Sequence, residues 1–105
     1  MDPALEEVVK RIVAHFNPEK IFLFGSRAQG SDVSASDYDL LVVMNELSEP
    51  GYRYSQKAHE ILWGIRCSKD VFFTSVERFE QLKNSVGSLS ELVHRDGREL
   101  YASAA

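Results

Sequence analysis

The sequence has few residues that form covalent cross-links, and it has no long apolar segment. It contains one cysteine, Cys67, among 105 residues, and a single cysteine cannot form an internal disulfide or, by itself, a thiolate metal site. No apolar stretch reaches the ~20 residues that span a bilayer, and the first residues lack the basic-then-apolar order of a secretion signal. We therefore expect a cytoplasmic protein in a reducing compartment, without a membrane partner.

Positive charge is also scarce. Twelve lysines and arginines stand against sixteen acidic residues, which gives a net charge of -4. Proteins that bind long nucleic acid neutralise its phosphates with a basic surface, so we expect no such partner here. Common phosphate loops are missing as well, because no Gly-Lys-Ser/Thr follows the first strand and no Gly-X-Gly-X-X-Gly opens a helix. Any nucleotide partner should be small or bridged by metal cations.

The hydrophobic pattern predicts one domain, residues 1–105, of mixed helices and strands. In chain order we expect a helix over 3–16, strands over 20–24 and 38–44, a helix over 52–63, a strand over 69–74, a helix from 75, a weak helix over 89–94, a short extended segment over 98–101 and a frayed tail over 102–105. The first link between strands lacks a full helix, which favours antiparallel neighbours, whereas the second contains one and favours a parallel pair. The predicted fold is α/β (α+β), a small mixed β-sheet flanked by helices.

Two acidic residues, Asp37 and Asp39, stand directly against the apolar run of the second strand. Side chains alternate across a strand, so both carboxylates should point to one face, where they repel each other unless a cation neutralises them. Oxygen ligands without histidine or cysteine favour Mg²⁺ or Mn²⁺ over zinc. Asp70 begins the next parallel strand and should join them at the same edge, although an acid after Lys69 can also be a surface ion pair.

A glycine and a serine, Gly25-Ser26, follow the first strand, and a helical turn is expected over 26–29. Glycine lets a phosphate approach the backbone, and serine adds a hydroxyl at a helix start. We therefore expect a nucleoside triphosphate as substrate. A third carboxylate, Asp70, suits a two-ion site that activates an attacking oxygen and steadies a leaving group, which predicts nucleotidyl transfer.

These residues together resemble the nucleotidyltransferase superfamily that includes DNA polymerase β, and in particular its minimal nucleotidyltransferase (MNT) antitoxins. The resemblance covers most of the chain and consists of a Gly-Ser pair, ten intervening residues, an Asp-Tyr-Asp segment and a later strand aspartate: Gly25, Ser26, Asp37, Tyr38, Asp39 and Asp70. It implies that the first two acids bind metal, that the third completes the site, and that the glycine and serine hold the triphosphate. It also implies an antitoxin that transfers AMP from ATP to a tyrosine hydroxyl of a HEPN-domain ribonuclease toxin.

One position departs from that pattern. Many relatives have Gly-Ser-Arg-Ala-Arg-Gly, whereas this chain has Gln29 in place of the second arginine, so a phosphate contact by that arginine is lost. Arg27 remains and is predicted to bind the nucleotide, although an arginine there could equally pair with a structural carboxylate.

Two other functions are compatible with the sequence. A noncatalytic binding module could neutralise a toxin by covering its active site, using apolar aromatic residues as the interface: Tyr52, Tyr54, Trp63 and Phe79. At helical spacing such residues are more often core, and the intact acids favour the enzyme. A small-molecule nucleotidyltransferase could also work as an oligomer with a pocket shared between subunits. A homo-oligomer or a hetero-oligomer is possible with each of these functions.

Several polar residues are predicted to have no role in the chemistry. Asp32 is interpreted as a turn former. Arg53 and His59 have a spacing that resembles the ribonuclease motif of HEPN proteins, but they fall on a helix of an α/β chain and are predicted to lie on a solvated helix face. His15 and His94 are isolated in sequence and are interpreted as surface histidines.

Overall fold

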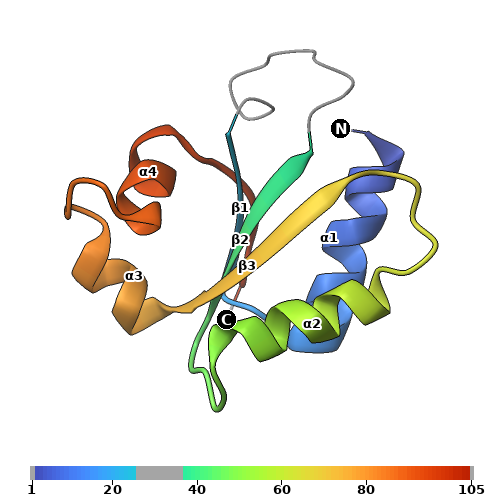
Figure 1. Cartoon of the computed structure of the whole chain (residues 1–105), viewed down its shortest axis with the longest axis horizontal. Coiled ribbons are helices and arrows are strands. Elements are labelled where there is room, and N and C mark those ends of the chain that lie inside the picture. Colours follow the sequence, from blue (N-terminus) through green and yellow to red (C-terminus); the bar gives the residue numbers. More distant parts are fainter. Residues whose placement is uncertain (1, 26–36, 105) are drawn as a thin grey trace.

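The structure, a computed structural model, describes residues 2–25 and 37–104. Its strands form a sheet, and helices cover both faces of that sheet (Figure 1). In chain order the elements are α1 (Pro3–Phe16), β1 (Lys20–Phe24), β2 (Tyr38–Met44), α2 (Gly51–Ile61), β3 (Lys69–Ser75), α3 (Val76–Leu82), α4 (Leu89–Asp96) and β4 (Arg98–Ala102). The predicted mixed α/β fold is confirmed. None of the described helices is long and apolar enough to cross a membrane.

The sheet has four strands in the order β3-β2-β1-β4. β1 is antiparallel to both β2 and β4, whereas β2 and β3 are parallel. The predicted pairings of the first three strands are therefore confirmed: β1 and β2 are antiparallel, and β2 and β3, which α2 connects, are parallel. The segment predicted to be extended near the end of the chain is β4, which forms one edge of the sheet.

Helix α1 begins and ends where its sequence dictates. The Asp2 side chain accepts a hydrogen bond from the amide of Ala4 at 3.0 Å and caps the first turn. At the other end, Asn17 adopts a left-handed conformation with φ of 51°, and its amide donates to Val13 at 3.0 Å. Pro18 cannot continue the helix, so the chain turns into β1.

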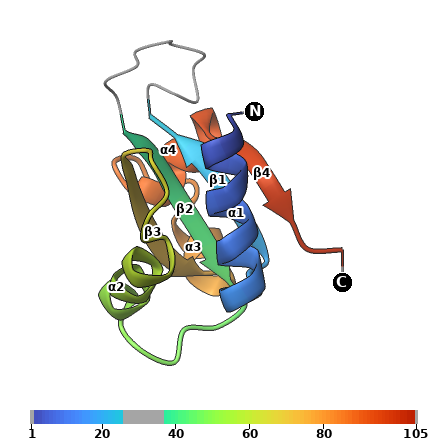
Figure 2. The same cartoon turned by 90° about the vertical axis from the view of Figure 1, so that its right-hand side faces the viewer.

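Helices α1 and α2 cover one face of the sheet, which we call the α1/α2 face (Figures 1 and 2). The larger of the two buried apolar clusters lies between them and the sheet: Leu5, Val8, Ile12, Ile21, Leu23, Tyr38, Leu40, Val42, Met44, Ala58 and Leu62. The three-and-four spacing in α1 and the alternate residues of β2 both supply this cluster. It is the principal core of the domain.

The opposite face, which we call the α3/α4 face, carries a smaller buried cluster: Phe24, Leu41, Val43, Phe79 and Val93. The rings of Phe22 and Phe79 stack with centroids 5.6 Å apart and planes 8° from parallel. From β2, this cluster contains Leu41 and Val43, which follow the first residues of the strand. At the start of β2 and β3 the same face carries Asp39, which is half-buried, and Asp70, which is exposed.

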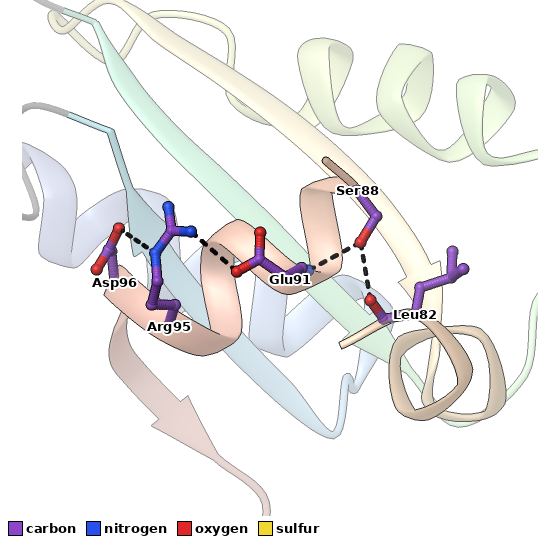
Figure 3. A network of polar contacts seen from close by, with 5 residues as sticks. All are labelled: Leu82, Ser88, Glu91, Arg95 and Asp96. Carbon is purple, nitrogen blue, oxygen red and sulfur yellow. Dashed lines mark hydrogen bonds and ion pairs between the residues drawn. The ribbon is translucent and has the colours of Figure 1, made fainter. Parts of the chain in front are cut away.

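A serine at the start of α4 joins the two helices of that face (Figure 3). The Ser88 hydroxyl donates to the carbonyl of Leu82 at 2.8 Å and accepts from the amide of Glu91 at 3.0 Å. Further along α4, Arg95 donates to Glu91 and to Asp96, each at 2.9 Å. Ser88 therefore caps α4 and ties it to the end of α3.

Three sequence-based expectations need correction. Helix α2 ends at Ile61, not at residue 63, because the chain turns at Leu62 and reaches a positive φ of 89° at Gly64. The tail predicted to fray from residue 102 is partly ordered, since Ala102 belongs to β4 and the Ser103 amide donates to Glu19 at 2.8 Å. Backbone pairing, which the local sequence does not reveal, fixes this end.

The third correction concerns aromatic residues expected in the core. Phe79 is buried and Tyr54 is half-buried, as expected. Tyr52 is 59% exposed and Trp63 is 81% exposed, so the core interpretation is wrong for these two. Tyr52 lies in the first turn of α2, and Trp63 follows the end of that helix.

Candidate active site

The candidate site is built around the first residues of β2. Tyr38 is buried on the α1/α2 face, where its phenol donates to the Asp2 carboxylate at 2.8 Å. Its amide donates to the carbonyl of Ser68 at 2.9 Å. These contacts fix the backbone between the two aspartates. Asp39 is half-buried on the other face, and Asp37 is exposed just before the strand begins.

Asp70 lies beside Asp39. In the parallel pairing of β2 and β3 the two residues are direct Cα partners. Neighbouring strands lie about 4.8 Å apart, and such partners project from the same face of the sheet. The predicted meeting of Asp39 and Asp70 at one edge of the sheet is therefore confirmed, while their catalytic roles stay predictions.

The carboxylates destabilise one another. The pKa of Asp39 is raised above its ordinary value, first by burial and then by the negative charges of Asp70 and Asp37. A raised pKa means that the surroundings disfavour the ionised form. A cation placed among these groups would reverse that effect, because it would favour the charged carboxylate.

Gly25 brings the end of β1 directly against the Asp39 carboxylate. It follows Phe24, which is the Cα partner of Asp39 across the antiparallel pair. The φ of Gly25 is +80°, and a Cβ at this position would lie 2.7 Å from Oδ2 of Asp39. Glycine is therefore required twice, by the backbone conformation and by the carboxylate. We call this end of the first strand, which lies against the Asp39 carboxylate, the Gly25 corner.

The donor set fits a divalent metal that also holds a substrate. Within residues 2–25 and 37–104, no three histidine, cysteine or acidic side chains are arranged to hold a metal ion by themselves. Mg²⁺ is usually bound by one or two carboxylates, with waters and substrate phosphates completing its shell. Asp39 with one neighbouring carboxylate has the chemistry of such a site. The full set of three predicted ligands stays a prediction.

Two predicted nucleotide-binding residues fall outside the described part of the chain. Ser26 and Arg27 belong to residues 26–36, as do Gln29, Asp32 and the predicted helical turn over 26–29. Their predicted roles stay predictions. Gly25 is the last residue described before this segment.

Comparison with known proteins identifies the family. A family model described as polymerase beta, nucleotidyltransferase matches residues 6–102. The chain belongs to this nucleotidyltransferase family. The match covers both strands that carry the aspartates and the Gly25 corner, and it confirms the resemblance to the superfamily that includes DNA polymerase β. A search of curated proteins found no match.

Solved structures share the nucleotidyltransferase fold. A protein from Sulfolobus solfataricus, described as a candidate nucleotidyltransferase, has 21% identity and a TM-score of 0.65, with 94% of this chain and 78% of that chain covered. A mutant of the toxin–antitoxin MntA–HpeT has 19% identity and a TM-score of 0.62, with 95% and 73% covered. A toxin–antitoxin with AMP-PNP has 22% identity and a TM-score of 0.57, with 94% and 74% covered. At these identities the likeness shows the fold.

The nucleotidyltransferase fold also places a cavity that the sequence did not reveal. A cavity of about 310 Å³ lies at the start of β3, beside α2, and is lined by Asp37, Ser55, His59, Leu62, Cys67, Ser68, Lys69 and Val71. His59 is exposed, as predicted for a solvated helix face. Its position near Asp37 depends on how the loop after α2 returns to the sheet, and no local sequence signal specifies that path.

A second feature missed from the sequence is an exposed aromatic ring on the face of the acids. Phe72 is 43% exposed, whereas its neighbours Val71 and Phe73 pack against the core on the α1/α2 face. Alternation puts Phe72 on the same face as Asp70. The sequence shows that Phe72 follows Asp70 by two residues. It does not show that Phe72 is exposed, because exposure depends on which part of the sheet the helices leave uncovered.

Proposed function

We propose that this protein is a metal-dependent nucleotidyltransferase that transfers AMP from ATP to a hydroxyl group of a partner toxin, as the antitoxin of a toxin–antitoxin pair. The observation that carries the proposal is the pairing of Asp39 with Asp70 beside Gly25, whose backbone lies against the Asp39 carboxylate. Membership of the nucleotidyltransferase family supports the reaction class.

Each aspartate has a distinct proposed role. Asp37 and Asp39 hold Mg²⁺, or Mn²⁺ in its place, and Asp70 completes the site from the neighbouring strand. The metal, when bound, supplies positive charge to the phosphate oxygens of the transition state. The raised pKa of Asp39 supports this assignment, because clustered carboxylates that disfavour their own charge gain most from a cation.

The proposed reaction is a substitution at the α-phosphorus of ATP. The acceptor hydroxyl oxygen attacks this phosphorus and forms the new O–P bond, while the bond from the α-phosphorus to the bridging oxygen breaks. Pyrophosphate leaves with that electron pair. The hydroxyl proton passes to the carboxylate of Asp70, which then releases it to water.

The nucleotide is proposed to bind at the end of β1. Gly25 lets the phosphates approach the backbone, Ser26 contributes a hydroxyl and an amide, and Arg27 contributes positive charge. The position of the Gly25 backbone, directly against the Asp39 carboxylate, supports phosphate binding beside the proposed metal site.

The proposed partner is a HEPN-domain toxin. Support comes from structures of the same fold that are toxin–antitoxins, one of them with AMP-PNP. The family resemblance of the Asp-Tyr-Asp segment points to the same type of partner. A hetero-oligomer of antitoxin and toxin follows from this proposal.

The test is transfer of label from α-³²P-ATP to the product of the neighbouring gene in the presence of Mg²⁺. We expect label on the partner with the natural protein and with the control Glu49→Gln, which removes one exposed charge from a loop. Label should fall at least about a hundredfold with Asp39→Asn, since a metal site contributes several kcal/mol to the transition state.

Two outcomes would contradict the proposal. Full labelling by the variant with both Asp37→Asn and Asp39→Asn would show that the chemistry lies elsewhere. Silencing of the partner without ATP, and equally well by that variant, would instead support neutralisation by binding alone.

A further inference from the structure

The residue between the two proposed metal-binding aspartates is anchored to the start of helix α1. The phenol of Tyr38, which is 6% exposed, donates to Oδ2 of Asp2 at 2.8 Å. The other carboxylate oxygen of Asp2, Oδ1, accepts from the amide of Ala4 at 3.0 Å and caps the helix. One carboxylate therefore joins the first turn of α1 to the segment that carries Asp37 and Asp39.

This anchor lies where the backbone pairing of β2 begins. Pairing with β3 starts at Tyr38 and pairing with β1 starts at Asp39, so Asp37 precedes both. The ends of secondary-structure elements open at the lowest free energy. A side-chain contact at the first residue of β2 therefore restrains its position more than the same contact would in the middle of the strand. The Tyr38 amide, which donates to the carbonyl of Ser68 at 2.9 Å, restrains the same residue through the backbone.

Helix α1 is a rigid base for the anchor. Leu5, Val8 and Ile12 are buried in the large core, so the helix cannot shift without exposing apolar surface. The phenol donates to a carboxylate, and hydrogen bonds to charged acceptors are about twice as strong as those between neutral groups. The position of Tyr38 is therefore coupled to that of a packed helix.

We infer that Asp2 is a positioning residue for the proposed metal site, because through the phenol of Tyr38 it holds residues 37–39 in the geometry that lets Asp37 and Asp39 share a cation. The inference rests on the proposed function and adds to it a residue that acts through Tyr38 and not by touching the metal. Groups that orient metal ligands typically contribute about tenfold to a hundredfold in metal affinity. Asp2 is distant in sequence from the aspartates that it positions.

Metal affinity tests the inference without turnover. Protein with AMP-PNP is titrated with Mn²⁺, and free Mn²⁺ is measured by electron paramagnetic resonance. Tyr38→Phe keeps the buried ring and removes the bond to Asp2. Asp2→Ser keeps a side chain that caps helices well but has no second oxygen for the phenol. We expect each variant to weaken Mn²⁺ binding about tenfold, and the double variant to be no weaker than Tyr38→Phe, since both remove the same contact.

The matched control is Ser88→Ala. It also removes a side-chain hydrogen bond at the start of a helix, in this case α4. Ser88→Ala should lower the thermal unfolding midpoint by an amount similar to Tyr38→Phe while leaving Mn²⁺ binding unchanged. This comparison separates the position of the aspartates from the stability of the domain.

The second test measures rescue of AMP transfer by metal. Tyr38→Phe should raise the Mg²⁺ concentration for half-maximal transfer about tenfold, and saturating Mg²⁺ should restore most of the natural rate. The KM for ATP at saturating Mg²⁺ should stay near its natural value. A merely structural role would leave the Mg²⁺ dependence unchanged.

Failure of this inference can be told apart from failure of the proposed function. Natural Mn²⁺ affinity in Tyr38→Phe or in Asp2→Ser, or equal weakening by Tyr38→Phe and Ser88→Ala, would overturn the positioning role alone. Absence of AMP-PNP-dependent Mn²⁺ binding by the natural protein would overturn the proposed function, and the role of Asp2 with it.

Discussion

The two faces of β2 differ sharply although they belong to the same seven residues. On the α1/α2 face, Tyr38, Leu40 and Val42 are all buried in the large core. On the α3/α4 face, Leu41 is buried in a smaller cluster, but the first position is the half-buried Asp39. Because side chains alternate along the strand, one face of β2 packs in the main core, while the first position on the other face carries a charged group.

The difference shows how a small domain can tolerate a charged cluster against its core. Asp39 is partly buried and lies near the negative charges of Asp70 and Asp37, and both effects disfavour its ionised form. The apolar layer directly behind it offsets this unfavourable term, since every second residue of the strand is fully buried there. The two faces should therefore respond differently to substitution.

The largest expected effect is on the core behind the site. Leu40 is 0% exposed and Leu41 is 2% exposed, and they lie on opposite faces. We expect Leu40→Ala to lower the free energy of unfolding by about 4–5 kcal/mol and Leu41→Ala by about 2–3 kcal/mol, the two ends of the range for buried leucines. The smaller cluster can collapse into the space more easily. Urea unfolding measures both, and equal losses would contradict the division between faces.

The next effect combines stability and activity at the corner that faces Asp39. Gly25→Ala should reduce the free energy of unfolding by about 1–3 kcal/mol because the φ of +80° strains any other residue. It should also reduce AMP transfer about tenfold to a hundredfold, because the added Cβ displaces the Asp39 carboxylate.

The matched control for that substitution is Gly64→Ala. Gly64 also has a positive φ, of +89°, but nothing lies within 4 Å of an added Cβ. Gly64→Ala should lower the free energy of unfolding through backbone strain but keep full AMP transfer. If both variants lost transfer equally, the effect would come from strain and not from the carboxylate.

Much of the fold and the meeting of the two strands could be predicted from local rules. Asn17-Pro18 ends the first helix, and the apolar run after Asp39 predicts a strand buried on both faces. Because a crossover helix makes β2 and β3 parallel, the pairing of Asp39 with Asp70 follows from topology.

Other features could not be predicted because they depend on how far each helix reaches across the sheet. The exposure of Phe72 and Trp63 is set by what α3, α4 and the end of α2 leave uncovered. The sequence shows an aromatic residue and an acidic residue two positions apart in a strand, and this pattern is the same whether or not a helix covers them. The roles of Ser26 and Arg27 remain predictions from the motif, since both lie outside the described residues.

A smaller effect should separate the α3/α4 face from the core on the other side. Ser88→Ala removes the cap of α4 and its bond to Leu82. We expect a loss of about 1 kcal/mol in the free energy of unfolding, with faster amide exchange in α3 and α4 and unchanged exchange in α1. Ser85→Ala, an exposed serine in the same connection, is the control. Uniform loss of protection across all helices would contradict an independent α3/α4 face.

The smallest expected effect has the opposite sign. Without metal, Asp39→Asn should raise the free energy of unfolding at neutral pH by less than about 1 kcal/mol, the range for partly solvated charge pairs. The native pKa of Asp39 is raised above its ordinary value of 3.8 by burial and by Asp70 and Asp37. Between 3.8 and that raised pKa the native state therefore binds more protons than the unfolded chain, and stability falls as pH rises.

The asparagine variant should lose this part of the pH dependence, whereas Glu49→Gln should keep it. Added Mg²⁺ should stabilise the natural protein and close the gap to Asp39→Asn, because a ligand that binds only the native state raises its stability. Thermal unfolding from pH 4 to pH 7, with and without Mg²⁺, measures both effects. If the variant were less stable than the natural protein in the absence of metal, Asp39 would be a structural residue, and the contrast between the two faces of β2 would have no bearing on catalysis.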